Sequence, residues 1–329
     1  MFSTPDVIIP GIAKSGTTAL ATLLARHSRL ALISPKEPHY YSWGLAQRNN
    51  VTHKSKILST QEYTDAIKQV RNGDKLVIDA STSYTHPGVI LDTVEQIKTH
   101  CPDARFIFSV RDPIKRLISD WKMRATEGWV PMKLSTSIEE ALTELMAALN
   151  VDSHQKLLDN IASNDSWLTH RDSEFPAGGT LISHGFYDRL LALYQQHFSE
   201  QVLVITQEQL RQEPDATLAL CFNHLNLQPE IFSDNNGQYN ASDYRRDTWL
   251  AKLIRQGRLA PIAKSILPKS LFTLARNAVT KEVSQPQNDL AEHSYLHDLL
   301  VELYRITTEK THRQVQQRYS IHWKLQSSS

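Results

Sequence analysis

The sequence predicts an α/β fold built around a five-stranded parallel sheet. Short apolar runs alternate with segments of helical periodicity, which is the pattern of repeated strand–helix units. The apolar runs are nearly continuous, so we expect strands that are covered on both faces. The five predicted strands are residues 7–9, 30–33, 76–78, 106–110 and 202–205.

Helical spacing fills the gaps between these strands. Mostly apolar side chains recur at helical intervals after the first strand, before the fourth and after the fourth: Leu20, Leu23 and Leu24, with His27; Ile90, Val94 and Ile97; Ile114, Leu117, Ile118 and Trp121. Pro113 stands where a first-turn proline is expected, and Asp112 beside it is a candidate cap. The spacing therefore predicts helices that connect the strands on both sides of the sheet.

The stretch between Arg124 and Gly179 carries no strand signal. Residues 137–158 have helical periodicity, and residues 175–179, Phe-Pro-Ala-Gly-Gly, have the composition of a loop. We interpret the stretch as a helical insertion into the α/β core and not as an independent domain.

The C-terminal third begins with a polar segment, residues 233–240, which predicts a loop. Residues 241–290 show helical signals interrupted by prolines, and residues 296–318 predict a closing helix. Its expected apolar face is Leu299, Leu300, Leu303, Tyr304 and Thr307. We predict one domain over residues 1–329: a core of 1–125 and 181–228, a helical insertion of about 126–180, and a lid with the closing helix over about 229–324.

Composition excludes several classes of protein. Of the 329 residues, 40% are hydrophobic, which is enough for a sizeable core, and the formal net charge of +1 argues against a nucleic-acid binder. Two cysteines cannot form a disulfide framework or a cysteine-rich zinc site. Neither a signal peptide nor an apolar run of membrane-spanning length is apparent. We therefore expect a soluble, cytoplasmic protein without membrane insertion.

The strongest local signal lies between Val7 and Leu20. A strand is followed by a turn that contains Gly11, Ser15 and Gly16, and then by an amphipathic helix. Such a turn points backbone N–H groups at one spot, and the helix N-terminus adds its positive end. The segment therefore predicts an anion site, for which phosphate is the usual occupant.

This loop differs from a nucleoside-triphosphate loop in one respect. The spacing from Gly11 to Gly16 matches the Walker A pattern, but Thr17 and Thr18 follow it in place of a Lys–Ser/Thr pair. The lysine lies inside the loop instead, as Lys14. The change weakens the case for magnesium and a triphosphate while it retains anion binding.

A second signal extends from Arg111 to Trp121. Arg111 stands at the end of the fourth strand, where ligands of open α/β sheets gather. Ser119 follows about two turns into the next helix, so it can face the same side. A guanidinium fork together with a hydroxyl suits a phosphate monoester.

Together, these segments resemble the paired signature of sulfotransferases that use 3′-phosphoadenosine-5′-phosphosulfate: Lys-Ser-Gly-Thr-Thr, and later Arg-Asp-Pro-x-x-Arg-x-x-Ser-x-Trp. The resemblance implies a P-loop-kinase-like, three-layer fold and no metal. It also implies that the loop of Lys14, Ser15, Gly16, Thr17 and Thr18 cradles the 5′-phosphosulfate. Arg111 and Ser119 would then hold the 3′-phosphate of the donor and of its product, 3′-phosphoadenosine-5′-phosphate.

The resemblance extends to the heparan sulfate N- and 3-O-sulfotransferases. Residues 35–41 look like their Lys-Glu-x-His-aromatic-aromatic segment, and residues 185–187 look like their Gly-x-Tyr helix start. The sequence departs from the pattern of these enzymes in two places, and both changes bear on the acceptor site more than on the donor site. Residues 80–84 read Ala-Ser-Thr-Ser-Tyr where the family has Lys-Thr/Ser-Pro-x-Tyr, and Ser42 replaces an acidic residue that often follows the aromatics.

Sulfuryl transfer to an alcohol needs a base, and donors that stabilise charge on the sulfuryl group and the leaving phosphate. With the resemblance in hand, Glu37 is the candidate base, because it follows the second strand at the sheet edge where the phosphate loop ends. His39 is a candidate to bind the acceptor or to tune Glu37, and Lys14 to stabilise the bridging oxygen. No ligand spacing in the sequence demands a metal.

The leading hypothesis is a sulfotransferase acting on a hydroxyl or amine of a carbohydrate. A small alcohol, a phenol or a lipid is the alternative acceptor. A P-loop kinase is a remote alternative, because the Gly-Lys-Ser/Thr step is missing. A non-catalytic nucleotide-binding module would not need the Lys36-Glu37-x-His39 arrangement.

Overall fold

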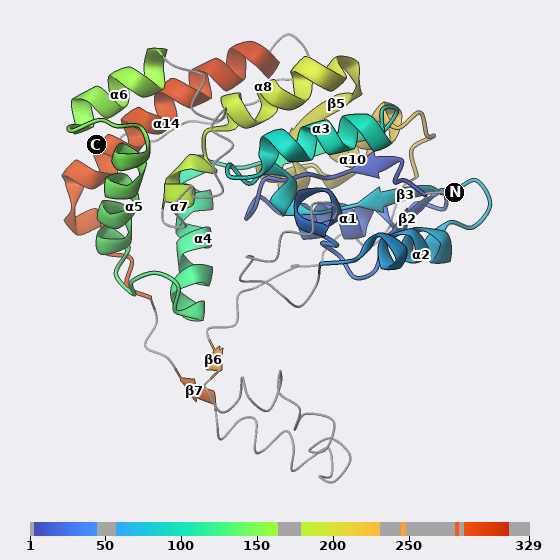
Figure 1. Cartoon of the computed structure of the whole chain (residues 1–329), viewed down its shortest axis with the longest axis horizontal. Coiled ribbons are helices and arrows are strands. Elements are labelled where there is room, and N and C mark those ends of the chain that lie inside the picture. The colour runs from blue at the N-terminus through green and yellow to red at the C-terminus, as the bar shows by residue number, and fades with distance from the viewer. Residues whose placement is uncertain are drawn as a thin grey trace.

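The computed structural model describes residues 3–44, 57–163, 179–230, 245–247, 280–282 and 286–315. Its main sheet has five strands, all parallel, in the order β2-β3-β1-β4-β5 (Figure 1). The strands are β1 Val7–Ile8, β2 Leu30–Leu32, β3 Leu76–Asp79, β4 Arg105–Val110 and β5 Val202–Thr206. The predicted fold class is therefore confirmed, with β1 at the centre of the sheet.

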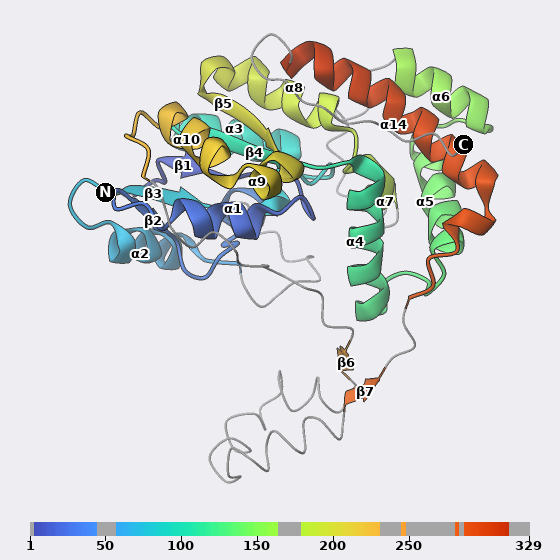
Figure 2. The same ribbon diagram turned by 180° about the vertical axis from the view of Figure 1, so that it is seen from behind.

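Side chains of the central strands alternate between two hydrophobic cores. Ile8 of β1 packs into one core, whereas its neighbours Val7 and Ile9 pack into the other. This is the two-residue period expected of a strand. Helices α1 and α10 contribute to the core on one face of the sheet, and helices α3 and α8 to the core on the other (Figures 1 and 2). Both faces are thus covered, as the apolar runs predict.

The helices around the sheet begin where the sequence places their caps. Asp112 caps α4 by accepting a hydrogen bond from the backbone N–H of Lys115 at 2.8 Å, and Pro113 is the first helical residue. The helices are α1 Thr17–Leu24, α2 Thr60–Val70, α3 Ile90–His100, α4 Pro113–Glu127, α8 Tyr187–Phe198, α9 Gln207–Gln212 and α10 Pro214–His224. A π-helix, Tyr40–Gly44, and a 3₁₀-helix, Thr82–Thr85, follow β2 and β3.

The helical insertion is divided more finely than its periodicity predicts. The helical character predicted over residues 137–158 is confirmed, and the structure divides it between two helices, α5 Leu134–Ala148 and α6 His154–Ser163. The break lies at Asn150, whose φ of 53° is a left-handed conformation that ends a helix. Of the expected loop over 175–179, Gly179 is described and begins α7, Gly179–Ser183; the rest lies outside the described residues.

The closing helix is α14, Ser294–Val315. The five residues of its predicted apolar face are buried, and Tyr304 donates a hydrogen bond to the carbonyl of Ile182 at 3.0 Å. Gly185 makes this packing possible, because a Cβ atom there would lie 2.5 Å from the Tyr304 ring. The predicted last residues of the helix, 316–318, lie outside the described residues.

The segment before α14 is described only in part. Its described residues include two strands, β6 Arg245–Asp247 and β7 Thr280–Glu282, which pair antiparallel where broken helical signals were predicted; the rest of the prediction over 241–290 lies largely outside the described residues. The predicted loop over 233–240 lies outside the described residues.

The described ends of this segment are tied to the body of the protein. Glu230 accepts a hydrogen bond from the backbone N–H of Ser28 at 3.1 Å. Gln287 exchanges backbone hydrogen bonds with Met132 at 2.9 Å and with Leu134 at 3.1 Å. Among the described helices, none combines the length and the apolar character needed to cross a membrane.

Candidate active site

The loop after β1 is fixed to the neighbouring strand β4. The backbone N–H of Ile12 donates to the Ser109 carbonyl at 2.8 Å, and the N–H of Ser109 donates to the Gly11 carbonyl at 3.0 Å. The Ser109 hydroxyl reaches the carbonyl of Ser15 at 2.6 Å. A Cβ atom at Gly11 would lie 2.4 Å from the Thr85 hydroxyl, so the segment after β3 also presses on the loop. The loop is therefore held in one shape from both sides.

Gly16 turns the loop into α1. Its φ of 83° is in the left-handed region, and a Cβ atom there would lie 3.1 Å from Gln207. No side chain caps this helix end, and its first turn contains no acidic residue. The amides around Thr17 and Thr18 therefore present the positive end of α1 without an internal anion.

Lys14 shares its surroundings with several other candidate residues. Burial lowers the pKa of its ammonium group; Asp120 and Glu37 raise that pKa and Arg111 lowers it, and the net direction is downward. The side chain also approaches Met123, with Nζ 3.6 Å from the sulfur. Lys14 therefore lies within electrostatic reach of both Arg111 and Glu37, which are far from it in the sequence.

Arg111 follows β4 directly and contacts the phosphate loop. Its Nη1 donates to the carbonyl of Lys14 at 3.4 Å, and its own carbonyl accepts from the Tyr187 hydroxyl at 2.8 Å. Ser119 is partly exposed on α4, eight residues further along, as its spacing predicts. The structure thus brings Arg111 against the loop and puts Ser119 on the helix that leaves the same strand end.

Glu37 lies just after β2 and is held by two neighbours. Oε1 accepts from Lys36 Nζ at 2.7 Å, and Oε2 accepts from the Thr82 hydroxyl at 2.9 Å. Burial alone would raise the pKa of this carboxyl, but Lys36, His39 and Thr82 together outweigh burial and lower it. The group is therefore ionised at neutral pH, and its φ of 63° fixes it in an unusual backbone conformation.

The residues after β3 hold the Glu37–His39 segment through their hydroxyl groups. Ser81 accepts from the backbone N–H of His39 at 3.2 Å, and Ser83 contacts His39 Nδ1 at 2.7 Å. Sequence reasoning noted this stretch for its missing lysine and missed its hydroxyls. The available signal was a run of three hydroxyl residues, 81–83, at the end of a strand that neighbours β1 and β2.

The buried carboxylate of Asp79 holds Ser81 in place. Asp79, at the end of β3, accepts hydrogen bonds from Tyr63 at 2.6 Å, Tyr84 at 2.7 Å and Ser81 at 2.7 Å. Burial raises the pKa of Asp79, and the three hydroxyls oppose that rise. Ser81 therefore joins Asp79 to the backbone of His39, and Asp79 fixes the segment without facing the site.

A second charged cluster lies on α4. Asp120 Oδ2 is 3.3 Å from Arg116 Nη1 and 2.9 Å from Arg124 Nη2. Arg116, the second arginine of the Arg-Asp-Pro-x-x-Arg motif, is fully buried and donates to the carbonyl of Leu181 in α7. Its role in the fold is therefore to tie α4 to α7.

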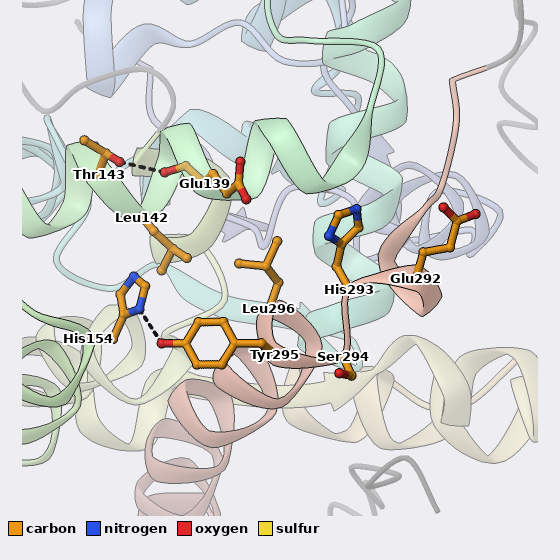
Figure 3. A pocket seen from close by; sticks show the side chains of 9 residues that line it. All are labelled: Glu139, Leu142, Thr143, His154, Glu292, His293, Ser294, Tyr295 and Leu296. Carbon is orange, nitrogen blue, oxygen red and sulfur yellow. Dashed lines mark hydrogen bonds between the residues drawn. The ribbon is translucent and has the colours of Figure 1, made fainter.

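A pocket of about 470 Å³ lies elsewhere, between α5, α6 and the start of α14 (Figure 3). His154 Nδ1 and the Tyr295 hydroxyl meet across it at 2.6 Å. It contains none of the predicted site residues. Within the described ranges, no three His, Cys, Asp or Glu side chains gather in a way that could hold a metal ion.

Comparison with known proteins points to one superfamily. Residues 5–161 match the model of the sulfotransferase family. A membrane-associated sulfotransferase, kil1, from Dictyostelium discoideum is 28% identical over 142 residues, which are 43% of this chain and 27% of that protein. The chain thus matches about a quarter of that relative's length. These matches support a place for this chain in the sulfotransferase superfamily.

Solved structures with a similar course of the chain are also sulfotransferases. The enzyme from Alicyclobacillus acidocaldarius has a TM-score of 0.49 at 19% identity, over 82% of this chain and 99% of that one. The sulfotransferase domain of the Synechococcus PCC 7002 olefin synthase has a TM-score of 0.45 at 15% identity, over 94% of each chain. The likeness to the heparan sulfate enzymes and the cytoplasmic location stay predictions.

Proposed function

We propose that this protein is a sulfotransferase that moves a sulfuryl group from 3′-phosphoadenosine-5′-phosphosulfate to a hydroxyl or amine of a carbohydrate. The observation that carries the proposal is that Lys14 meets both Arg111, which donates to its carbonyl at 3.4 Å, and the negative charge of Glu37. Two cations next to an uncapped helix N-terminus suit an anionic donor, and an ionised carboxylate suits proton removal from an acceptor. The family match over residues 5–161 supports the same class of reaction.

On the donor side, the 5′-phosphosulfate binds the phosphate loop and the first turn of α1. Lys14 stabilises the negative charge that develops on the oxygen between sulfur and phosphorus as that bond breaks. Arg111 and Ser119 hold the 3′-phosphate. The shape of the loop and the half-buried Arg111 fit such a donor, because hydrogen bonds within the protein itself hold both in place.

On the acceptor side, Glu37 takes the proton of the attacking hydroxyl. The acceptor oxygen forms its bond to sulfur while the bond from sulfur to the phosphate oxygen breaks, and 3′-phosphoadenosine-5′-phosphate leaves. Lys36 and Thr82 orient the carboxylate, and the lowered pKa keeps it ionised at neutral pH, so that it holds no proton of its own. His39 positions the acceptor beside Glu37.

Calorimetry with two nucleotides tests the donor site. We expect Arg111→Ala to weaken the binding of 3′-phosphoadenosine-5′-phosphate by roughly 10- to 100-fold, because a hydrogen bond to a charged group is worth about 1.5–3 kcal/mol. Binding of the analogue without the 3′-phosphate should scarcely change. Arg29→Ala is the matched control, since Arg29 is exposed and paired with Asp74. Equal losses for both nucleotides would contradict the assignment of Arg111.

Incubation with labelled donor and a panel of acceptors tests the reaction. The panel contains carbohydrates, small alcohols, phenols and lipids, and transfer of label is followed by mass spectrometry. We expect label on a carbohydrate. Transfer to a phenol or lipid alone would refute the carbohydrate as acceptor. Nucleotide binding without transfer to any acceptor would refute the proposal that the protein is a sulfotransferase.

A further inference from the structure

The described part of the chain contains three methionines and two cysteines, and one of these sulfur atoms differs from the rest in its exposure. Met123 on α4 is 36% exposed. Met132 and Met146 pack against the hydrophobic core, and Cys101 and Cys221 are free thiols inside the two cores. Burial raises the pKa of both thiols to about 12, so neither carries the thiolate that oxidants attack. Met123 is therefore the described sulfur that is most open to an oxidant.

Met123 also contacts the lysine of the phosphate loop. Lys14 Nζ donates to the Met123 sulfur at 3.6 Å, and among the described residues no other hydrogen bond from this ammonium group is present. A thioether is a weak hydrogen-bond acceptor. The reduced sulfur therefore competes only weakly with a bound anion for the charge of Lys14.

We propose that Met123 is a modification site at which a peroxide switches off the lysine of the phosphate loop. The sulfur lone pair attacks one oxygen of hydrogen peroxide, an S–O bond forms and the O–O bond breaks. The thioether is oxidised by two electrons to methionine sulfoxide, and the peroxide is reduced to water. One thioether and one hydrogen peroxide thus give one sulfoxide and one water.

The added oxygen changes what Lys14 contacts. A sulfoxide is polar, and its oxygen accepts a hydrogen bond far better than a thioether does. Because the sulfur lies 3.6 Å from Nζ, the flexible Met123 side chain can bring this oxygen within hydrogen-bond distance of the ammonium group. Lys14 then has a partner inside the protein that competes with the phosphosulfate of the donor, a step that rests on the proposed function. Enzymatic reduction of the sulfoxide restores the thioether and frees Lys14 again.

Limited peroxide treatment of the folded full chain, followed by peptide mass spectrometry, tests the site. We expect Met123 to be oxidised several times faster than Met132 and Met146, because those two pack against the core, and we expect both cysteines to stay reduced. Met1 lies outside the described residues and is scored on its own peptide. Oxidation of Met132 or Met146 at the rate of Met123 would overturn the assignment.

Calorimetry with 3′-phosphoadenosine-5′-phosphate tests the switch, and each protein is compared with its own untreated sample. Oxidation of the unaltered protein should weaken nucleotide binding by roughly 10- to 100-fold, which is the range for a lost hydrogen bond to a charged group. Methionine sulfoxide reductase should restore the affinity. Oxidation should leave the affinity of Met123→Leu unchanged, while Met146→Leu, the matched control, should lose as much as the unaltered protein.

Two results would refute the switch alone: an equal loss in oxidised Met123→Leu, or complete oxidation of Met123 with no loss of affinity. If the untreated protein bound no nucleotide, the proposed function would fail and the switch with it. The relative oxidation rates of the methionines would still decide whether Met123 is the modification site.

Discussion

Replacing Glu37 with glutamine removes a proton acceptor and preserves the shape of the side chain. The amide oxygen can retain the 2.7 Å bond from Lys36. The amide nitrogen then faces Thr82, whose hydroxyl can rotate from donating to accepting. The variant should therefore fold and bind the donor nucleotide like the unaltered protein, so that a loss of rate reports on the proton acceptor.

The expected loss follows from the role of a general base. Such a group contributes about 10²- to 10⁴-fold, so kcat of Glu37→Gln should fall by that factor while donor affinity stays unchanged. Thr82→Val is the matched comparison: it retains the carboxylate and removes one hydrogen bond, so we expect a loss of only about 10-fold.

Single-turnover transfer from labelled donor measures the rate, and calorimetry measures nucleotide affinity. The unaltered enzyme should lose activity in acid, as pH falls through the lowered pKa of Glu37, and in alkali, as Lys14 loses its charge at a lowered pKa. If Glu37→Gln retained full turnover, Glu37 would not be the base, and His39 would be the next residue to test.

Three further changes test the packing. Gly185→Ala should lower the free energy of unfolding by about 1–3 kcal/mol in urea titrations, because its Cβ would lie 2.5 Å from the Tyr304 ring. Gly16→Ala should cost about 1–2 kcal/mol and weaken nucleotide binding, since a side chain is strained at its φ of 83°. Burial lowers the pKa of His184 well below 6.5 and that of neighbouring His86 to about 4. Between pH 6.5 and about 4, the two imidazoles therefore bind protons in the unfolded chain and not in the folded one, so the free energy of unfolding should decrease as pH drops through this range. His184→Phe should make this decrease smaller. An unchanged decrease would contradict the reasoning.

The parts of the fold that could be predicted are those determined by neighbouring residues. The strands around Val7 and Phe106 are apolar runs between turn signals, and Asp112 with Pro113 is a local start signal for a helix. Asn150 shows the limit of periodicity. Its neighbours continue a helical pattern, but a single residue in the left-handed conformation divides the helix.

The geometry around Glu37 could not be predicted from its own segment. Glu37 and His39 both have positive φ, at 63° and 55°, and for Glu37 the residue type does not suggest this conformation. They are held by the hydroxyls of residues 81–83, more than forty positions further along the chain. Only the pairing of β2 with β3 brings the two segments together, so the contact depends on the sheet as a whole.

The chain between Glu230 and Gln287 leaves and re-enters the body at two fixed points, one beside Ser28 and one just before α5. Closing a loop between fixed ends costs only about 0.6 kcal/mol more for each doubling of its length. Stability therefore places a weak limit on how long this stretch can be. A change in the length of this stretch should therefore leave the loop after β1 and the start of α4 as they are.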